Sequence, residues 1–230
     1  MRVLGLSLFL AVYGNVAALI VGTAVPIGWS GLVLALVLLA AVLAWARFVD
    51  RLTPLELGLT RKHLLRGTRL GLLVALAAAL PSLLFLTYPP LVGKSIAYSP
   101  LASLSTEALL WRAFVSMPLD TAIPEEIAFR GVLLATLRRR FADRAAMLVS
   151  AAVFTAWHGV VVSRTIALTN LDAEPLLAAL GLIGAFIAIG CGGVLFAWLR
   201  LTSGHLAGSI VAHWAFNASL LLGLAWSGSQ

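Results

Sequence analysis

Two adjacent glutamates inside an apolar stretch are the residues of this sequence best suited to chemistry. They lie in the run Pro124-Glu125-Glu126-Ile127-Ala128-Phe129-Arg130. Neighbouring residues on a helix project about 100° apart, so Glu125 and Glu126 cannot perform the same task. Glu126 and Arg130 are spaced i,i+4 and can pair on one helical face. Glu125 is then left without a local cation, and a desolvated carboxylate takes up a proton readily, as a general base near neutral pH must.

Two later apolar runs carry imidazole groups. His158 closes the first run, one helical turn after Phe154. In the second run, polar residues recur every four positions, at His205, Ser209, His213 and Asn217. On a helix these residues form one slowly drifting stripe, in which His213 and Asn217 lie one turn apart. Carboxylate, imidazole and amide groups together provide a base, a second proton carrier and an oxyanion donor, which hydrolysis of an amide by water requires.

Each feature also has a structural explanation when taken alone. The glutamates and the arginine are also consistent with an ion-pair cluster that fixes helix packing, and the histidines with hydrogen bonding between helices. Glutamate and histidine in membrane helices also serve as proton relays, so a proton-coupled transporter, or a non-catalytic immunity or scaffold membrane protein, is the alternative. The sequence contains no G-x-S-x-G, H-E-x-x-H or Walker motif, which removes support for those chemistries. The single cysteine, Cys191, is expected to be a small packing residue.

The three motifs together resemble those of the CPBP family, which contains CAAX-type prenyl endopeptidases (the Rce1-like, or Abi, group) and related intramembrane proteases. The motifs are Glu125-Glu126-x-x-x-Arg130, Phe154-x-x-x-His158 and His213-x-x-x-Asn217, and the resemblance covers roughly residues 118–222. It implies a glutamate-dependent intramembrane endopeptidase that acts on a membrane-associated peptide or lipidated protein, prenylated in the CAAX-type case.

The resemblance also implies a role for each motif residue. Glu125 with His158 would activate water, and Glu126 would support that site. His213 and Asn217 would stabilise the oxyanion, with Arg130 and Phe154 in supporting positions. No cofactor is required by this scheme. Glu125, His158 and His213 also match a His₂Glu zinc set, so zinc stays open as an alternative.

The composition places these motifs in a membrane protein. Of 230 residues, 61% are hydrophobic and 11% are charged, and the mean hydropathy is +1.03. Soluble domains have about 25% charged residues, so an ordinary soluble enzyme is excluded. The net charge of +7 comes from residues at the edges of apolar runs. That placement indicates membrane orientation, and we expect lipid as a partner and no binding of nucleic acid.

We expect an all-α polytopic membrane helix bundle, with residues 1–230 as a single transmembrane domain. About seven spans and one partial or interfacial helix are predicted, which makes eight helices. The spans are expected at Val3–Val25, Gly31–Val49, Leu70–Leu86, Thr121–Leu137, Ala145–Val162, Pro175–Leu199 and Gly204–Ala225.

The position of the partial helix follows from the basic loops. The loops Arg47–Arg69 and Arg138–Arg144 are the richest in Lys and Arg, and both are expected to be cytoplasmic. An even number of spans must then separate them, so Leu101–Met117 is expected to lie at the interface or to re-enter, and a full span is the alternative. The N-terminus is expected to be cytoplasmic, in a bacterial or archaeal cytoplasmic membrane. The oligomeric state is not predicted.

Overall fold

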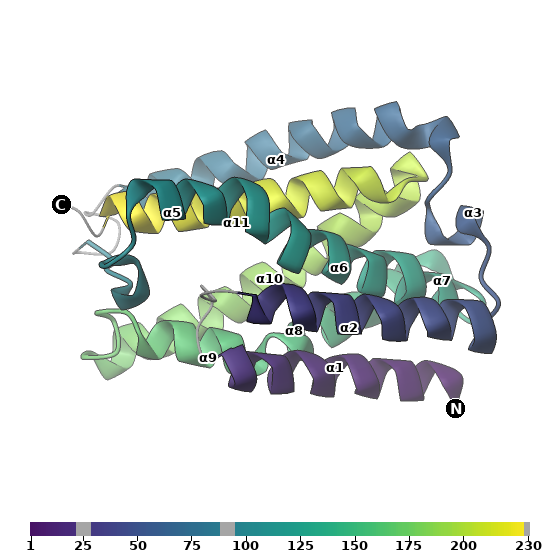
Figure 1. The fold of residues 1–230 in the computed structure, drawn as a ribbon, viewed down its shortest axis with the longest axis horizontal. Coiled ribbons are helices and arrows are strands. Elements are labelled where there is room, and N and C mark those ends of the chain that lie inside the picture. The colour runs from purple at the N-terminus through teal and green to yellow at the C-terminus, as the bar shows by residue number, and fades with distance from the viewer. Residues whose placement is uncertain (22–28, 88–94, 228–230) are drawn as a thin grey trace.

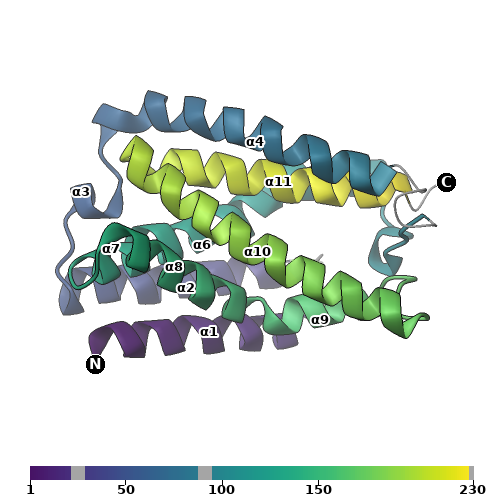
Figure 2. The same ribbon diagram turned by 180° about the vertical axis from the view of Figure 1, so that it is seen from behind.

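The computed structural model describes residues 1–21, 29–87 and 95–227, and these form a bundle of helices. Tyr98 and Thr169 form an isolated β-bridge, and the described residues contain no strand. The helices are α1 (Arg2–Val21), α2 (Ser30–Ala44), α3 (Pro54–Leu57), α4 (Leu64–Thr87), α5 (Thr106–Trp111), α6 (Ile123–Glu126), α7 (Leu134–Arg138), α8 (Asp143–Trp157), α9 (Gly159–Ala167), α10 (Pro175–Ser203) and α11 (Leu206–Ser227). In Figures 1 and 2, α1 and α4 lie on opposite sides of the bundle. The predicted all-α class is confirmed.

The number of membrane-crossing helices is lower than predicted. Five helical segments in the described part of the chain are long and apolar enough to cross a membrane: Arg2–Val21, Ser30–Val49, Pro54–Leu80, Pro175–Ser203 and Leu206–Ser227. The bent pair α8 and α9 makes six if it counts as one span. The protein is therefore an integral membrane protein with five or six such helices rather than about seven. The segment expected at 121–137 is not among them, because charged residues interrupt its apolar character.

The prediction of a separate helix at Leu101–Met117 is wrong. The chain is helical without a break from Thr106 to Arg138, so Pro118 does not stop it. Three wide π-helical stretches join the α-helical pieces, at Arg112–Ser116, Pro118–Ala122 and Ile127–Leu133. A proline inside an α-helix lacks an N–H donor and its ring clashes with the carbonyl four residues earlier. A wider turn moves that carbonyl away, so the helix continues past the proline.

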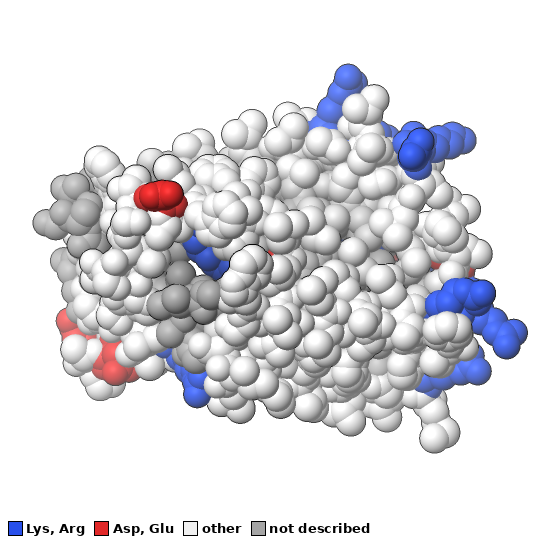
Figure 3. All heavy atoms as spheres, in the orientation of Figure 1, with Lys and Arg blue, Asp and Glu red and all other residues white. Residues whose placement is uncertain are grey.

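The two basic loops lie at the same end of the bundle. In Figure 1, the N-terminus, α3 and the end of α7 are at one end, and the start of α5 is at the other. Figure 3 shows most of the visible Lys and Arg side chains at the end that holds the N-terminus, and most of the visible acidic side chains at the opposite end. The arrangement agrees with the expectation that both loops face the same side of the membrane. That this side is cytoplasmic stays a prediction.

Helices α4 and α11 pack closely because glycines face each other. A Cβ atom built on Gly71 would lie 2.5 Å from the carbonyl oxygen of Gly208, and one on Gly208 would lie 2.9 Å from that of Gly67. Both distances are shorter than a side chain tolerates. In Figures 1 and 2 the two helices run side by side along the length of the bundle. Small residues at such contacts let the two backbones approach, as is common between membrane helices.

We expect Gly208→Leu to destabilise the bundle strongly, because the added side chain must displace the α4 backbone. Overpacking typically lowers the free energy of unfolding by about 1–3 kcal/mol. Because the obstructing atoms here belong to the backbone, we expect a loss at the upper end of this range or above it. Thermal unfolding of the purified protein in detergent measures the effect. Gly184→Leu on α10 is the matched control, since nothing lies within 4 Å of a Cβ atom at Gly184. Equal unfolding temperatures for the two variants would contradict the prediction.

Candidate active site

The two glutamates lie on α6, between the two ends of the bundle (Figure 1), and both are buried. Glu126 and Arg130 are completely buried and form the expected ion pair, with 3.0 Å between Oε1 and Nη1. Arg130 also donates from Nη2 to the carbonyl of Gly193 on α10, at 3.3 Å. The guanidinium therefore neutralises Glu126 and not Glu125, as the i,i+4 spacing predicts.

Aromatic rings surround the guanidinium of Arg130. Its Cζ atom lies 4.1 Å from the ring centre of Phe154, 5.2 Å from that of Phe196 and 5.8 Å from that of Phe129. A desolvated cation gains energy from the faces of such rings, which partly offsets the loss of its water shell. Phe154 was predicted as a supporting residue from its motif. The two other phenylalanines were missed, because a phenylalanine in an apolar helix gives no signal in the sequence.

His213 joins this ion pair from α11. Its Nδ1 lies 2.9 Å from Oε1 of Glu126, and its ring stacks on that of Phe196 with 5.1 Å between ring centres. Because Arg130 favours the ionised form of Glu126, the carboxylate accepts and the Nδ1–H donates. The other nitrogen, Nε2, faces Glu125 at 3.9 Å from Oε2. Glu126 thus fixes the orientation of the His213 ring.

His158 approaches Glu125 from the junction between α8 and α9. Its Nδ1 lies 2.7 Å from the carbonyl oxygen of Phe154. A carbonyl oxygen only accepts, so Nδ1 carries the proton and Nε2 presents a lone pair in the neutral ring. Nε2 lies 3.8 Å from Oε2 of Glu125. Three helical segments that are distant in sequence therefore direct one carboxylate and two imidazoles toward each other.

The Oε2 atom of Glu125 is the meeting point of these groups. It is buried and has no hydrogen-bond partner within the described chain. The distances of 3.8 and 3.9 Å to the imidazole nitrogens are too long for direct hydrogen bonds. Two carboxylates face one guanidinium here, so one further proton on Glu125, His158 or His213 makes the cluster neutral. A buried cluster favours that neutral state.

The remaining predicted residues occupy different places. Asn217 is half-buried one turn after His213 on α11, and its amide makes no hydrogen bond to another described residue. Ser209 is buried, and its hydroxyl donates to the carbonyl of Leu206. His205 lies before the helix starts, and its Nδ1 accepts the N–H of Ala207 at 2.8 Å. His205 therefore caps α11 and is not part of the cluster around Glu125.

A zinc site is not formed by the side chains as they stand. No group of three or more His, Cys, Asp or Glu side chains in the described part of the chain has the geometry to hold a metal ion. A tetrahedral zinc bound at about 2.0–2.1 Å would place its ligand atoms about 3.4 Å apart. The Nε2 atoms of His158 and His213 are farther than that from Oε2 of Glu125. The described side chains therefore do not fit a zinc ion in this arrangement.

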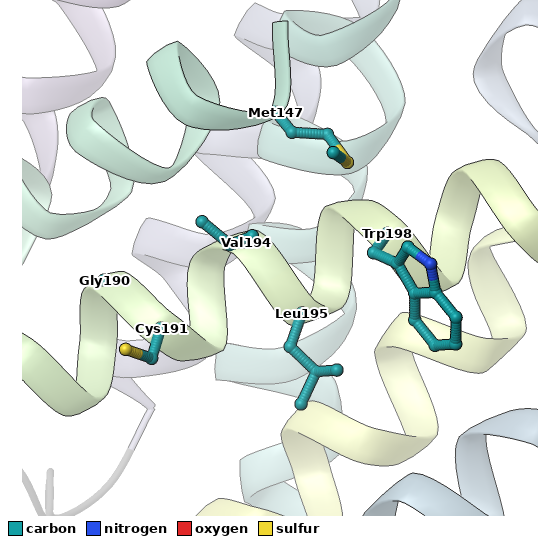
Figure 4. A pocket seen from close by; sticks show the side chains of 6 residues that line it. All are labelled: Met147, Gly190, Cys191, Val194, Leu195 and Trp198. Atoms are coloured by element: carbon teal, nitrogen blue, oxygen red, sulfur yellow. The ribbon is translucent and has the colours of Figure 1, made fainter. Parts of the chain in front are cut away.

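An apolar groove on the outside of the bundle is separate from this cluster. Figure 4 shows its six lining residues on α8 and α10, namely Met147, Gly190, Cys191, Val194, Leu195 and Trp198, and its volume is about 450 Å³. Cys191, which was predicted to be a small packing residue, is exposed in this groove. None of the six residues belongs to the cluster around Glu125. The groove lies on an apolar surface of the kind that faces lipid.

The fold and this cluster define an integral membrane protein with a buried glutamate–histidine site. Residues 106–219 match the family model described as "Type II CAAX prenyl endopeptidase Rce1-like". Through this domain the chain belongs to the Rce1-like family of CAAX-type prenyl endopeptidases, as the three motifs indicated. Neither curated proteins nor solved structures give a significant match to the chain. The matched residues contain Glu125, His158 and His213 and overlap the core expected at 118–222.

Proposed function

We propose that the protein is an intramembrane endopeptidase in which Glu125, aided by His158, activates water for attack on a peptide bond. One observation carries the proposal: Oε2 of Glu125 lies 3.8 and 3.9 Å from the Nε2 atoms of two histidines in a buried setting, while Arg130 neutralises the adjacent Glu126. Packing alone needs no second buried carboxylate without a cation. Membership of a protease family agrees with this chemistry.

In the proposed first step, a water donates one hydrogen bond to Glu125 and one to Nε2 of His158. Both are acceptors, so the oxygen lone pairs are free to point at the scissile carbonyl. As the oxygen–carbon bond forms, Glu125 takes the proton from the water. When the carbon–nitrogen bond breaks, Glu125 returns this proton to the leaving amine. The products are a carboxylic acid, which keeps the second proton of the water, and an amine, and the enzyme regains its starting protonation state.

The negative charge that develops on the carbonyl oxygen needs donors. Nδ1–H of His213 donates to Glu126, and a proton on its Nε2 would supply the first donor. With Glu125 and Glu126 ionised, such an imidazolium also balances the charge of the cluster. The Asn217 amide, one turn farther along α11, is assigned as the second donor. Glu126 and Arg130 then act by positioning His213, and not by contact with substrate.

For the substrate, we propose a membrane-associated protein that carries a prenyl chain in the CAAX pattern. The cluster lies midway along a bundle of apolar helices, so a substrate must be able to enter the bilayer to reach it. A prenyl chain supplies membrane affinity through its buried methylene groups. The family name points to the same class of substrate.

Purified protein in liposomes, given a farnesylated CAAX peptide and the same peptide without the lipid, tests the proposal. We expect cleavage of the farnesylated peptide and little cleavage of the other, with the cut site identified by mass spectrometry. No cleavage of either peptide, together with proton flux that Glu125→Gln abolishes, would instead favour a transporter. Loss of cleavage with a zinc chelator, and its recovery with added zinc, would contradict the metal-free step. Proteins that accumulate uncleaved in a Glu125→Gln strain would identify the natural substrate.

A further inference from the structure

The helix that carries His158 is interrupted at that residue. Helix α8 ends at Trp157 and α9 begins at Gly159, and the two axes differ by 46°. In a continuous helix the N–H of Val160 would donate to the carbonyl of Ala156. Such groups have no water to bond in the interior of a membrane, so a bend there needs a substitute partner.

One side chain from α1 satisfies both groups. Oδ1 of Asn15 accepts from the N–H of Val160 at 2.7 Å, and Nδ2 donates to the carbonyl of Ala156 at 2.8 Å. Nδ2 also donates to the carbonyl of Ala11 on its own helix, at 2.7 Å. The Asn15 amide therefore replaces the missing backbone hydrogen bond, because it accepts from the N–H of Val160 and donates to the carbonyl of Ala156. A carboxamide suits this position because it holds a donor and an acceptor in one plane.

The same bend fixes the proton on His158. The backbone N–H of His158 donates to the carbonyl of Thr155, so the carbonyl of Phe154 is available for the imidazole. The Nδ1–H of His158 donates to that carbonyl, and its Nε2 faces Glu125. The orientation and tautomer of His158 therefore depend on the bend that Asn15 holds open.

Helix α1 has little freedom to move away from this junction. A Cβ atom on Gly14 would collide with the indole ring of Trp157, so the two helices are in direct contact there. One turn farther along α9, Arg164 donates to the carbonyl of Ala18 near the end of α1, at 3.0 Å. The contacts on both sides of Asn15 keep its amide at the bend.

We propose that Asn15, which lies outside the family domain, is a positioning residue that holds the bend at His158 and thereby aims Nε2 at Glu125. This inference rests on the proposed function. It assigns to α1 a role in the reaction although α1 carries none of the three motifs. Asn15 touches neither of the two groups proposed to bind the water, and acts through the backbone on either side of His158.

Asn15→Leu removes both bonds to the bend at similar side-chain volume. We expect kcat for the farnesylated peptide to fall about 10- to 100-fold, the effect typical of losing a group that orients an active imidazole, with KM little changed. Tyr13→Phe is the matched control. It removes a hydrogen bond of α1 to the carbonyl of Leu34, at 2.6 Å, and leaves the bend untouched. If Asn15→Leu has the same kcat as Tyr13→Phe, the proposal is overturned.

Asn15→Asp adds a pH signature that a general loss of stability does not produce. A protonated aspartic acid offers an O–H donor and a carbonyl acceptor, as the amide does, and an ionised one has no donor for Ala156. We expect this variant to approach wild-type kcat at low pH and to lose activity relative to wild type as pH rises. His158, between α8 and α9, and Arg164 on α9 are the ionisable groups near this site. A pH profile parallel to that of wild type would overturn the proposal even if Asn15→Leu does not fold.

Nuclear magnetic resonance of ¹⁵N-labelled histidine reads the tautomer without any substrate. The chain has four histidines, so a His158→Gln sample assigns the signal. We expect the Nδ1–H tautomer of His158 in the wild type and a mixture of tautomers in Asn15→Leu, or in Asn15→Asp at high pH. An unchanged tautomer would overturn the inference. If the wild type cleaves neither peptide but Asn15→Leu still changes the tautomer of His158, the proposed function alone is refuted.

Discussion

We expect Glu125→Gln to lower the rate of peptide cleavage by about 10²- to 10⁴-fold, the range typical of losing a general base. The amide keeps nearly the same shape but cannot take a proton from water. The bundle should stay folded, because the change removes a buried charge that has no cation of its own. Single-turnover cleavage of the farnesylated peptide in liposomes measures the loss of the chemical step. His158→Ala should reduce the same step, since it removes the second acceptor for the water.

Glu107→Gln provides the control for this experiment. It makes the same chemical change on the same continuous helical segment, but Glu107 is exposed at the start of α5. Its activity should equal that of the wild type. Full cleavage by both Glu125→Gln and His158→Ala would falsify the catalytic roles proposed for these residues. Loss of activity in Glu107→Gln would indicate instead that any charge change on this segment is harmful.

Arg130→Met should be the most destabilising substitution in the site. It leaves Glu126 fully buried with its charge balanced only through His213. Removing one partner of a buried ion pair typically costs about 3–5 kcal/mol, and the rings of Phe154 and Phe196 also lose the cation that they enclose. Thermal or chemical unfolding in detergent measures the loss.

The double variant Glu126→Gln/Arg130→Met separates charge from packing. With both partners of the buried ion pair removed, it should recover much of the stability lost in Arg130→Met, although activity should stay low because His213 has lost its carboxylate. Arg138→Met is the matched control. Arg138 pairs with Asp143 at 2.7 Å with both side chains exposed, so its loss should cost at most about 1 kcal/mol. If the loss of unfolding free energy in the double variant equals the sum of the losses in the two single variants, Glu126 and Arg130 are not a coupled buried pair.

The part of the site set by local spacing could be predicted from the sequence. The pair Glu126 and Arg130 follows from the geometry of a single helical turn, and the structure contains it. The approach of His158 and His213 to Glu125 is a contact between distant segments, which spacing alone does not determine. It was anticipated only because three motifs of complementary chemistry occur together. The same limit explains why Phe196, which stacks on His213, was missed.

The helix breaks were harder to predict, because partners elsewhere in the chain decide them. Pro118 predicts a helix end, yet wide turns carry the helix past it. Conversely, the apolar run 145–162 predicts one straight span, yet the structure bends it at His158. The amide that stabilises the bend lies outside that run, because it belongs to Asn15. Hydropathy and periodicity describe one helix at a time and do not register such a partner.

The contact between Asn15 and Val160 also constrains the order in which the site is assembled during synthesis. The two residues are 145 positions apart, so α1 enters the membrane long before the ribosome has made α9. Until then, the bend at His158 does not exist and the amide has no partner across the helices. A nascent chain therefore carries both glutamates in the bilayer before it holds a complete site.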